Sequence, residues 1–217
     1  MPAKPQWHDR MAAGQQLALR LQRWHRDPQA IAIGLPRGGV VVAAEVAQHL
    51  QIPLRSWAVR KLAHPSNPEL ALGAIGPGGI ELWEEPYALL DAQWRARVLE
   101  QERQELQRRQ HLYGDPSLKS LRHRHLLVID DGVATGLTVR AALHSLRQAQ
   151  PKQLVLAVPV IDRQIARQLR SLVSELVALQ EVDNLWAVGC WYERFEAVND
   201  QEVLELLAQQ SEAPMRR

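Results

Sequence analysis

The sequence predicts an α/β domain in which about five parallel strands form one sheet flanked by helices. Five short apolar segments begin near residues 30, 54, 125, 153 and 175, and each is followed by a helical pattern or a loop. This alternation is typical of parallel sheets, because parallel neighbours need long crossover connections. A chain of 217 residues can bury one full core, so we expect a single domain over residues 1–217.

Each element follows from a local pattern. Asp9 is a plausible N-cap for the first amphipathic helix, and Pro28 ends that helical pattern before the first strand. Aliphatic segments predict strands over residues 30–35, 53–59, 126–129, 153–158 and 175–179. Apolar residues at helical spacing predict helices over residues 9–24, 40–50, 91–112, 139–149, 159–171 and 200–207.

Composition narrows the class of function. The formal net charge of +2 gives no bulk electrostatic reason to expect nucleic acid or membrane binding. No segment approaches the ~20 apolar residues of a membrane span, and the first residues lack an apolar signal core, so we expect a cytoplasmic protein. The single cysteine, Cys190, excludes an internal disulfide framework, and its apolar neighbours favour a core position over a nucleophile.

The first predicted strand runs directly into a compact turn, Pro36, Arg37, Gly38 and Gly39, which opens a helix. The glycines let the backbone come close to a ligand, and the N–H groups at the helix start favour an anion. Arg37 adds a positive charge suited to a diphosphate. The alternative is an ordinary tight turn with a surface arginine.

The same order recurs at residues 125–138, with the sequence HLLVIDDGVATGLT. Asp130 and Asp131 end the apolar strand, and a turn of small residues leads into the next helix. The N–H groups and hydroxyls of this turn can surround a phosphate, whereas the carboxylates suit hydroxyl groups or a magnesium ion. A ligand that combines phosphate and diol is a sugar phosphate. The alternative is an ordinary unit with a solvated aspartate pair.

This segment resembles the phosphoribosyl-diphosphate-binding motif of the type I phosphoribosyltransferases: four apolar residues, two acids, and a small turn closing on Gly-x-Thr. The resemblance implies that family's fold, and transfer of a 5-phosphoribosyl group from phosphoribosyl diphosphate, with Mg²⁺, to a nitrogenous base with release of pyrophosphate. It also implies that Asp130 and Asp131 address the ribose hydroxyls. Dimers are common in the family, so a homodimer is compatible with the resemblance, and the sequence leaves the oligomeric state open. The implied 5-phosphate site consists of Ala134, Thr135, Gly136, Leu137 and Thr138.

The resemblance extends to two further segments. Residues 36–39 look like the pyrophosphate loop of the family, which in some members holds a non-proline cis peptide, here the Pro36–Arg37 bond. Residues 60–86, rich in glycine and proline, are expected to form a mobile loop or hairpin flap. In the family such a loop closes over the site and excludes water. Arg60 and Lys61 would contact the diphosphate, or else form a solvated charge pair.

An aromatic segment near the C-terminus, residues 183–199, is expected to form a small hood. By resemblance to purine-type members, Trp186 would stack on the acceptor and Val188 would line its site. Glu193 would lie near metal or base, so Asp130, Asp131 and Glu193 are the candidate magnesium residues, acting mostly through the substrate. The alternative is an aromatic cap that packs on the core.

The sequence does not identify the acceptor of the phosphoribosyl group. Ala134 stands where many 6-oxopurine enzymes place an aspartate, and alanine cannot accept a proton. Two other classes of function are compatible with the motifs. One is a non-catalytic sensor of phosphoribosyl diphosphate or nucleotides on the same fold. The other is a phosphatase or receiver-like protein, which would place acids at the end of the first strand, where residues 36–39 stand instead.

Overall fold

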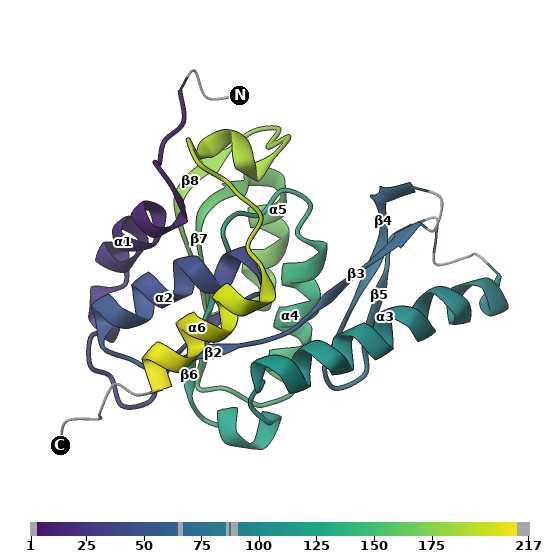
Figure 1. The fold of residues 1–217 in the computed structure, drawn as a ribbon, viewed down its shortest axis with the longest axis horizontal. Coiled ribbons are helices and arrows are strands. Elements are labelled where there is room, and N and C mark those ends of the chain that lie inside the picture. The colour runs from purple at the N-terminus through teal and green to yellow at the C-terminus, as the bar shows by residue number, and fades with distance from the viewer. Residues whose placement is uncertain (1–3, 65–66, 86, 88–90, 212–217) are drawn as a thin grey trace.

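A five-stranded parallel sheet forms the centre of the computed structural model, which describes residues 4–64, 67–85, 87 and 91–211 (Figure 1). The strand order is β2-β1-β6-β7-β8, and all four pairings are parallel. The predicted fold class is therefore confirmed, with all five strands present. Their bounds are β1 Ala30–Gly34, β2 Leu54–Ser56, β6 His125–Ile129, β7 Gln153–Asp162 and β8 Glu175–Val182.

Helices cover both faces of this sheet, because alternate residues of the buried strands point to opposite sides. Ala30, Ala32 and Leu127 pack with the first group of helices, whereas Ile31 and Leu126 pack with the second. The first group is α1 (Arg10–Arg20), α2 (Gly38–Leu50) and α6 (Asp200–Ser211), and the second is α4 (Leu137–Arg147) and α5 (Arg163–Leu169). Short 3₁₀ turns cover Gln22–Trp24, Leu118–Leu121, Arg170–Leu172 and Val188–Trp191.

Residues 60–64 and 67–83 form a second sheet beside the core, where the sequence predicts a mobile loop or hairpin flap. Its antiparallel strands are β3 (Arg60–His64), β4 (Asn67–Gly76) and β5 (Ile80–Trp83). The long helix α3 (Ala92–Tyr113) covers one side, and α4 packs against the other (Figure 1). The hairpin is thus a folded subdomain attached to α4. Residues 65–66 and 86 of the expected flap lie outside the described residues.

Strand β7 is longer than the sequence predicts, and this difference shapes the site. The sequence predicts a helix that opens at Pro159, but Val160 and Ile161 continue the ladder with β8, so that expectation is wrong. The helix α5 begins instead after Asp162, whose Oδ1 accepts hydrogen bonds from the N–H groups of Gln164 and Ile165 at 2.8 and 3.2 Å. The strand does not end at Pro159, because pairing with β8 continues beyond it and because Asp162 provides a good N-cap for the helix that follows.

Asp9 caps α1 as expected, with its Oδ1 accepting the Ala12 N–H at 2.9 Å. Cys190, by contrast, is exposed, so its expected core position is wrong. The neighbouring aromatic residues Trp191 and Tyr192 take the buried side of that segment. Among the described helices, none is both long and apolar enough to cross a membrane.

Candidate active site

The two motif turns meet at the carboxyl edge of the central sheet. Strands β1 and β6 are neighbours in parallel register, with Gly34 opposite Ile129, so the turns after them emerge side by side. The Leu35 N–H donates to the Ile129 carbonyl at 2.9 Å. Ligands of open parallel sheets bind at this edge. The geometry therefore brings the glycine turn and the acidic turn into one place.

The contact between the two turns is close enough to require glycine. A Cβ atom on Gly38 would overlap the carboxylate of Asp131. A Cβ atom on Gly39 would lie 2.8 Å from Asp130 Oδ1, closer than real Cβ atoms come to a neighbour. The glycine backbone thus lies directly against both carboxylates, where the N–H groups at the start of α2 and the acids can address the same ligand.

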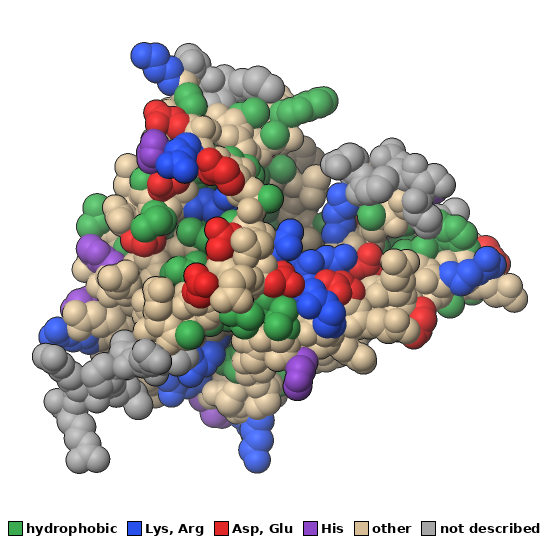
Figure 2. Space-filling model, in the orientation of Figure 1, with side chains coloured by type: hydrophobic (Ala, Val, Ile, Leu, Met, Phe, Trp, Pro, Cys, Tyr) green, Lys and Arg blue, Asp and Glu red, His purple; other side chains and the backbone are tan. Residues whose placement is uncertain are grey.

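Arg37 occupies the outer side of the glycine turn. The Pro36–Arg37 peptide bond is cis, as the family resemblance implies. The Arg37 side chain is 40% exposed, and its Nη1 lies 3.5 Å from Asp200 Oδ1 at the start of α6. Tyr113 and Arg108 of α3 also donate to the Asp200 carboxylate, at 2.6 and 3.1 Å. Figure 2 shows basic and acidic side chains gathered on the face where α6 meets the end of α3.

The Asp200 carboxylate is strongly stabilised in its charged form. The hydrogen bond from Tyr113 and that from Arg108 both lower the pKa of Asp200. In return, burial and the hydrogen bond to Asp200 raise the pKa of Tyr113 to about 12. Arg37 therefore pairs with a carboxylate that stays ionised throughout the neutral range.

The two aspartates of the second turn sit in unequal surroundings. Asp130 Oδ1 accepts the N–H of Asp131 at 2.9 Å, while Asp131 Oδ2 accepts Arg10 Nε at 2.7 Å. Burial, with the neighbouring Asp131 charge, raises the pKa of Asp130 well above its usual range. Burial also raises the pKa of Asp131, but the Arg10 guanidinium opposes that shift. The pair is therefore short of positive charge, and a bound cation would favour ionisation of both acids.

The remainder of the second turn is held by β7. The Val133 N–H donates to the Val160 carbonyl at 2.9 Å, and the Asp162 N–H donates to the Val133 carbonyl at 2.9 Å. The extension of β7 thus fixes the turn as an added piece of sheet. Gly136, with φ of 74°, then begins α4, and no side chain caps this described helix start. Its first N–H groups are thus left for another partner.

The side chains around this helix start differ in what they can offer. Thr135 is exposed and Thr138 is half-buried, so both side chains lie near the protein surface. Leu137 is buried in the core and can contribute only its backbone. Ala134 is half-buried and packs against the apolar cluster beneath the hood. The five residues implied as a 5-phosphate site are contiguous around one helix start.

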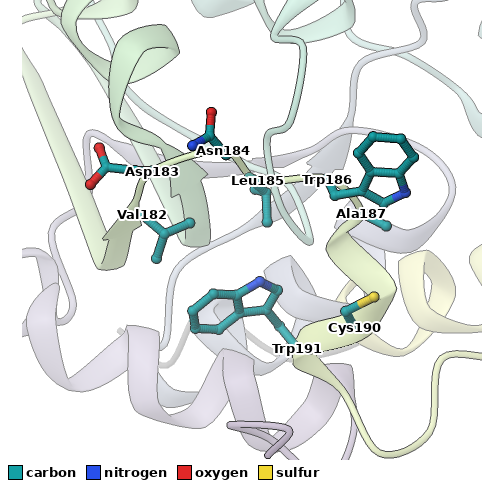
Figure 3. Close-up of a pocket in the computed structure, with 8 residues that line it drawn as sticks. All are labelled: Val182, Asp183, Asn184, Leu185, Trp186, Ala187, Cys190 and Trp191. Carbon is teal, nitrogen blue, oxygen red and sulfur yellow. The ribbon is translucent and has the colours of Figure 1, made fainter. Parts of the chain in front are cut away.

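The hood places its residues in different environments. Val188 packs on the acidic turn, since a Cβ atom on Gly132 would lie 2.5 Å from Val188 Cγ1. Trp186 is 84% exposed, so it does not pack on the core as the aromatic-cap alternative expects. It borders a cavity of about 220 Å³ within the hood, in which Trp191 points toward Val182 and Leu185 (Figure 3). The cavity is lined by Val182, Asp183, Asn184, Leu185, Trp186, Ala187, Cys190 and Trp191.

Three other candidate residues have protein partners. Arg60 Nε donates to Glu102 of α3 at 2.8 Å, and both side chains are mostly buried. Lys61 lies next to it on β3, opposite Ala74 of β4. Glu193 forms an exposed ion pair with His8, with Oε2 2.7 Å from Nδ1. Across the described ranges, no three His, Cys, Asp or Glu residues are grouped as a metal site.

Comparison with known proteins agrees with this geometry. A family model described as "Phosphoribosyl transferase domain" matches residues 11–194. The chain belongs to this family. It is 39% identical over 204 residues to a Mycobacterium tuberculosis H37Rv protein named "Putative phosphoribosyl transferase Rv0571c", which covers 92% of this chain. The match takes up 46% of that relative, so the chain spans about half the length of the curated relatives it matches.

A solved structure shares the fold of this phosphoribosyl transferase domain. The crystal structure of TT1426 from Thermus thermophilus is 37% identical, with a TM-score of 0.73, and the alignment covers 94% of this chain and 99% of that one. The two proteins therefore correspond over nearly their whole described architecture.

Two residues of the site are absent from the sequence-based prediction. Arg10 contacts Asp131 although the two residues are 121 positions apart in the sequence. The hydroxyl of Tyr192, 61 positions from Asp131, donates to the Asp131 carbonyl at 2.5 Å. Arg10 stands in the first turn of an amphipathic helix and Tyr192 in an aromatic run, where such residues are common without function. No local spacing in a single sequence could have indicated either contact.

Proposed function

We propose that this phosphoribosyl transferase domain moves a 5-phosphoribosyl group from phosphoribosyl diphosphate to a nitrogenous acceptor, releasing pyrophosphate. The observation that carries the proposal is the direct contact of the glycine turn with the aspartate pair, through Gly38 and Gly39. One turn offers cationic and N–H groups for a diphosphate, and the other offers acids for ribose hydroxyls. The two halves of such a donor meet where these turns meet.

The 5-phosphate is assigned to the start of α4. Uncapped N–H groups and the positive end of the helix dipole favour a doubly charged phosphate. Thr135 and Thr138 add hydroxyl donors, while Ala134, Gly136 and Leu137 contribute their backbone. Because Val133 is held by β7, this turn needs little reordering when the phosphate binds.

The acidic pair is assigned to the ribose. Each carboxylate can accept a hydrogen bond from a ring hydroxyl, and negative charge nearby stabilises the positive charge that develops at the anomeric carbon. In the transfer, the bond from this carbon to the diphosphate oxygen breaks, and its electron pair leaves with the diphosphate. The acceptor nitrogen forms the new carbon–nitrogen bond with its own lone pair and then loses a proton. This scheme needs no covalent nucleophile; positioning and electrostatics carry it.

The leaving diphosphate is assigned to Arg37 and to the N–H groups of Gly38 and Gly39. A guanidinium and the start of α2 can stabilise the charge that builds on this group. Mg²⁺, when bound with the donor, would supply further neutralisation of the diphosphate. Two buried carboxylates short of positive charge fit a hard cation, and the lack of any described three-residue cluster fits an ion held mostly by the substrate.

The acceptor is assigned to the side of the hood. Trp186 presents an exposed flat indole to which a nucleobase can stack, and Val188 closes the space above the acidic turn. Ala134 offers no side-chain acid to a purine ring. A base recognised by stacking and by backbone groups fits this wall better than one recognised through a carboxylate.

The test is an assay of pyrophosphate release from phosphoribosyl diphosphate and Mg²⁺ with a panel of purines, pyrimidines and other amines. Wild-type protein should release pyrophosphate with at least one acceptor. The double variant Asp130→Asn with Asp131→Asn should lose this turnover by several orders of magnitude while keeping its circular dichroism spectrum, because the ribose loses both charged acceptors.

A matched control removes two carboxylates elsewhere. Glu100 of α3 and Glu205 of α6 are both exposed, so Glu100→Gln with Glu205→Gln should leave turnover unchanged. Wild-type turnover in the aspartate double variant would end the mechanism. Donor binding without turnover for every acceptor would instead support the non-catalytic sensor.

A further inference from the structure

Arg10 lies at the junction of three segments that meet at the site. It is the first residue of α1, its side chain is 12% exposed, and its Nε donates to Asp131 Oδ2 at 2.7 Å. Its Nη1 donates to the carbonyl of Glu196 at 2.9 Å, and its Cζ lies 3.7 Å from the centre of the Phe195 ring. The guanidinium plane is thus placed by two hydrogen bonds and a stacking contact.

The ion pair also touches the glycine turn. A Cβ atom on Gly38 would lie 2.8 Å from Arg10 Nε, besides overlapping the Asp131 carboxylate. The pair of Arg10 and Asp131 is therefore packed against the backbone of the segment assigned to the diphosphate. A shift of this pair would move either the acid or that backbone.

Tyr192 of the hood also contacts Asp131 and Phe195, two residues that Arg10 contacts. The Tyr192 hydroxyl donates to the Asp131 carbonyl at 2.5 Å, and its ring stacks on Phe195 with centroids 5.0 Å apart. The backbone beside Arg10 pairs with the hood as well: the Arg194 N–H donates to the His8 carbonyl at 2.8 Å. The Arg10 side chain thus contacts the hood at the Glu196 carbonyl and the Phe195 ring, and the backbone of nearby His8 is hydrogen-bonded to the hood.

Arg10 distinguishes the two acids. It pairs with Asp131, whereas the Asp130 carboxylate accepts the N–H of Asp131. The charged or titratable groups that face Asp131 are Arg10 from α1, Asp130 from the end of β6 and Tyr192 from the hood. Of these, Arg10 is the cation, and it therefore opposes protonation of Asp131.

We propose that Arg10 is a positioning residue of the donor site: it holds the Asp131 carboxylate in place for a ribose hydroxyl and links that carboxylate to the hood. This inference rests on the proposed function, because it assigns Asp131 to the donor. It adds a residue of the N-terminal helix to a site otherwise built from the two turns and the hood. Arginine is required for this geometry, since an ammonium group cannot serve two acceptors in one plane while lying flat on a ring.

The experiment measures the affinity of the full chain for phosphoribosyl diphosphate with Mg²⁺ by calorimetry at neutral pH. Arg10→Met should weaken binding about tenfold, since a charge-assisted hydrogen bond to the acid is lost. In an Asp131→Asn background the same Arg10→Met change should have little further effect, because Arg10 acts through the Asp131 carboxylate. Arg10→Lys should recover part of the affinity that Arg10→Met loses, since the ammonium keeps the charge beside Asp131 but not the geometry.

Two further variants separate charge, position and bulk folding. Arg20→Met changes an exposed arginine of the same helix and should bind like wild type. Phe195→Leu removes the stacking contact but keeps both hydrogen bonds, and should weaken binding about threefold. A purely structural role for Arg10 would lower the melting temperature and would weaken binding equally in the wild-type and Asp131→Asn backgrounds.

Each outcome decides something. Wild-type affinity in folded Arg10→Met, or an equal loss in the Asp131→Asn background, overturns the inference and leaves the proposed function standing. If Arg10→Met does not fold, Arg10→Lys and Phe195→Leu decide: wild-type affinity in both overturns the inference. Failure of the wild-type chain to bind the donor at all overturns the proposed function, and the inference with it.

Discussion

The two strand–turn–helix units of this protein have the same order of elements, but their turns differ in length and in what they contact. After β1, residues 35–37 lead into α2 at Gly38, whereas after β6 the longer turn of residues 130–136 leads into α4. The short turn has little room of its own, and its glycines bring its backbone against the acids of the other unit. The long turn is fixed in the middle, where Val133 exchanges two backbone hydrogen bonds with β7.

Glycine serves a different purpose in each unit. Gly38 and Gly39 are needed because of what stands next to them, the two carboxylates. Gly136 is needed because of its own backbone, whose φ of 74° is strained for other residues, and a Cβ atom there would also lie 2.5 Å from Ile165 Cγ2. The glycines of the first unit are required by the space between segments, whereas Gly136 is required by local conformation as well as by space. Similar sequence patterns thus produce one turn whose backbone lies against the neighbouring unit and one longer turn with a left-handed glycine at its helix start.

The largest expected effect comes from widening the gap between the two units. Gly38→Ala places a methyl group into the Asp131 carboxylate, so one of the turns must move. Displacement of reacting groups by about 1 Å costs roughly 100-fold in function, and we expect a loss of donor affinity of at least that size. The measurement is calorimetric binding of phosphoribosyl diphosphate with Mg²⁺.

A double-mutant cycle identifies the cause of that loss. Asp131→Ala removes the group with which the new methyl overlaps, so Gly38→Ala should destabilise the Asp131→Ala protein much less than the wild type in urea unfolding. Equal destabilisation in both backgrounds would show that the backbone of Gly38 is not in close contact with the Asp131 carboxylate.

A smaller effect is expected from the outer charge of the short turn. Arg37→Met should weaken donor binding about tenfold, because a charge-assisted contact to the diphosphate is lost. Stability should change by less than about 1 kcal/mol, since the ion pair of Arg37 with Asp200 is long and exposed. Binding isotherms and urea unfolding curves measure the two quantities.

Asp200→Asn is the matched control for Arg37. It removes the competing carboxylate but leaves the guanidinium, so donor affinity should equal or exceed that of the wild type. No loss in Arg37→Met would mean that the short turn acts through its backbone alone, and a tenfold loss in Asp200→Asn would mean that Asp200 positions Arg37 instead of competing for it.

The smallest effect concerns the stability cost of the acidic turn. Burial raises the folded-state pKa of Asp130 above its unfolded value, so the ionised acid destabilises the fold at every pH above that folded pKa. Asp130→Asn should therefore raise the melting temperature at neutral pH while weakening donor binding. The gain should disappear in acid, where the wild-type carboxyl is already protonated. A variant that melts below wild type at neutral pH would contradict this assignment.

Much of the fold is accessible from the sequence because strand periodicity and connection length are local. All five parallel strands are predicted, and the convergence of the two turns follows from the rule that carboxyl ends meet at one edge. The extension of β7 is not predicted, because Pro159 signals a break unless the partner strand β8 is known. The sequence predicts a flap where the second sheet lies, since glycines and prolines mask short antiparallel pairing.

The site is predictable only where its residues are neighbours in sequence. Residues within 130–138 and 36–39 fall into recognisable runs, but the contact of Arg10 with Asp131 depends on three-dimensional packing. The core position expected for Cys190 is wrong, because alternating exposure in a short 3₁₀ turn cannot be deduced from apolar composition. The Arg37 contact with Asp200 likewise joins segments 163 positions apart.

The pairing of residues 6–8 with the hood has a consequence for biosynthesis. The Glu193 N–H donates to the Trp7 carbonyl at 2.9 Å, and Gln6 and Trp7 donate to the Trp191 carbonyl. A ribosome makes residues 6–8 before the strands of the central sheet, and it makes the hood after them. The parallel core, by contrast, has all its strands once β8 has emerged. The nascent chain can therefore assemble its central sheet before its site is enclosed, and the last step of enclosure waits for the hood.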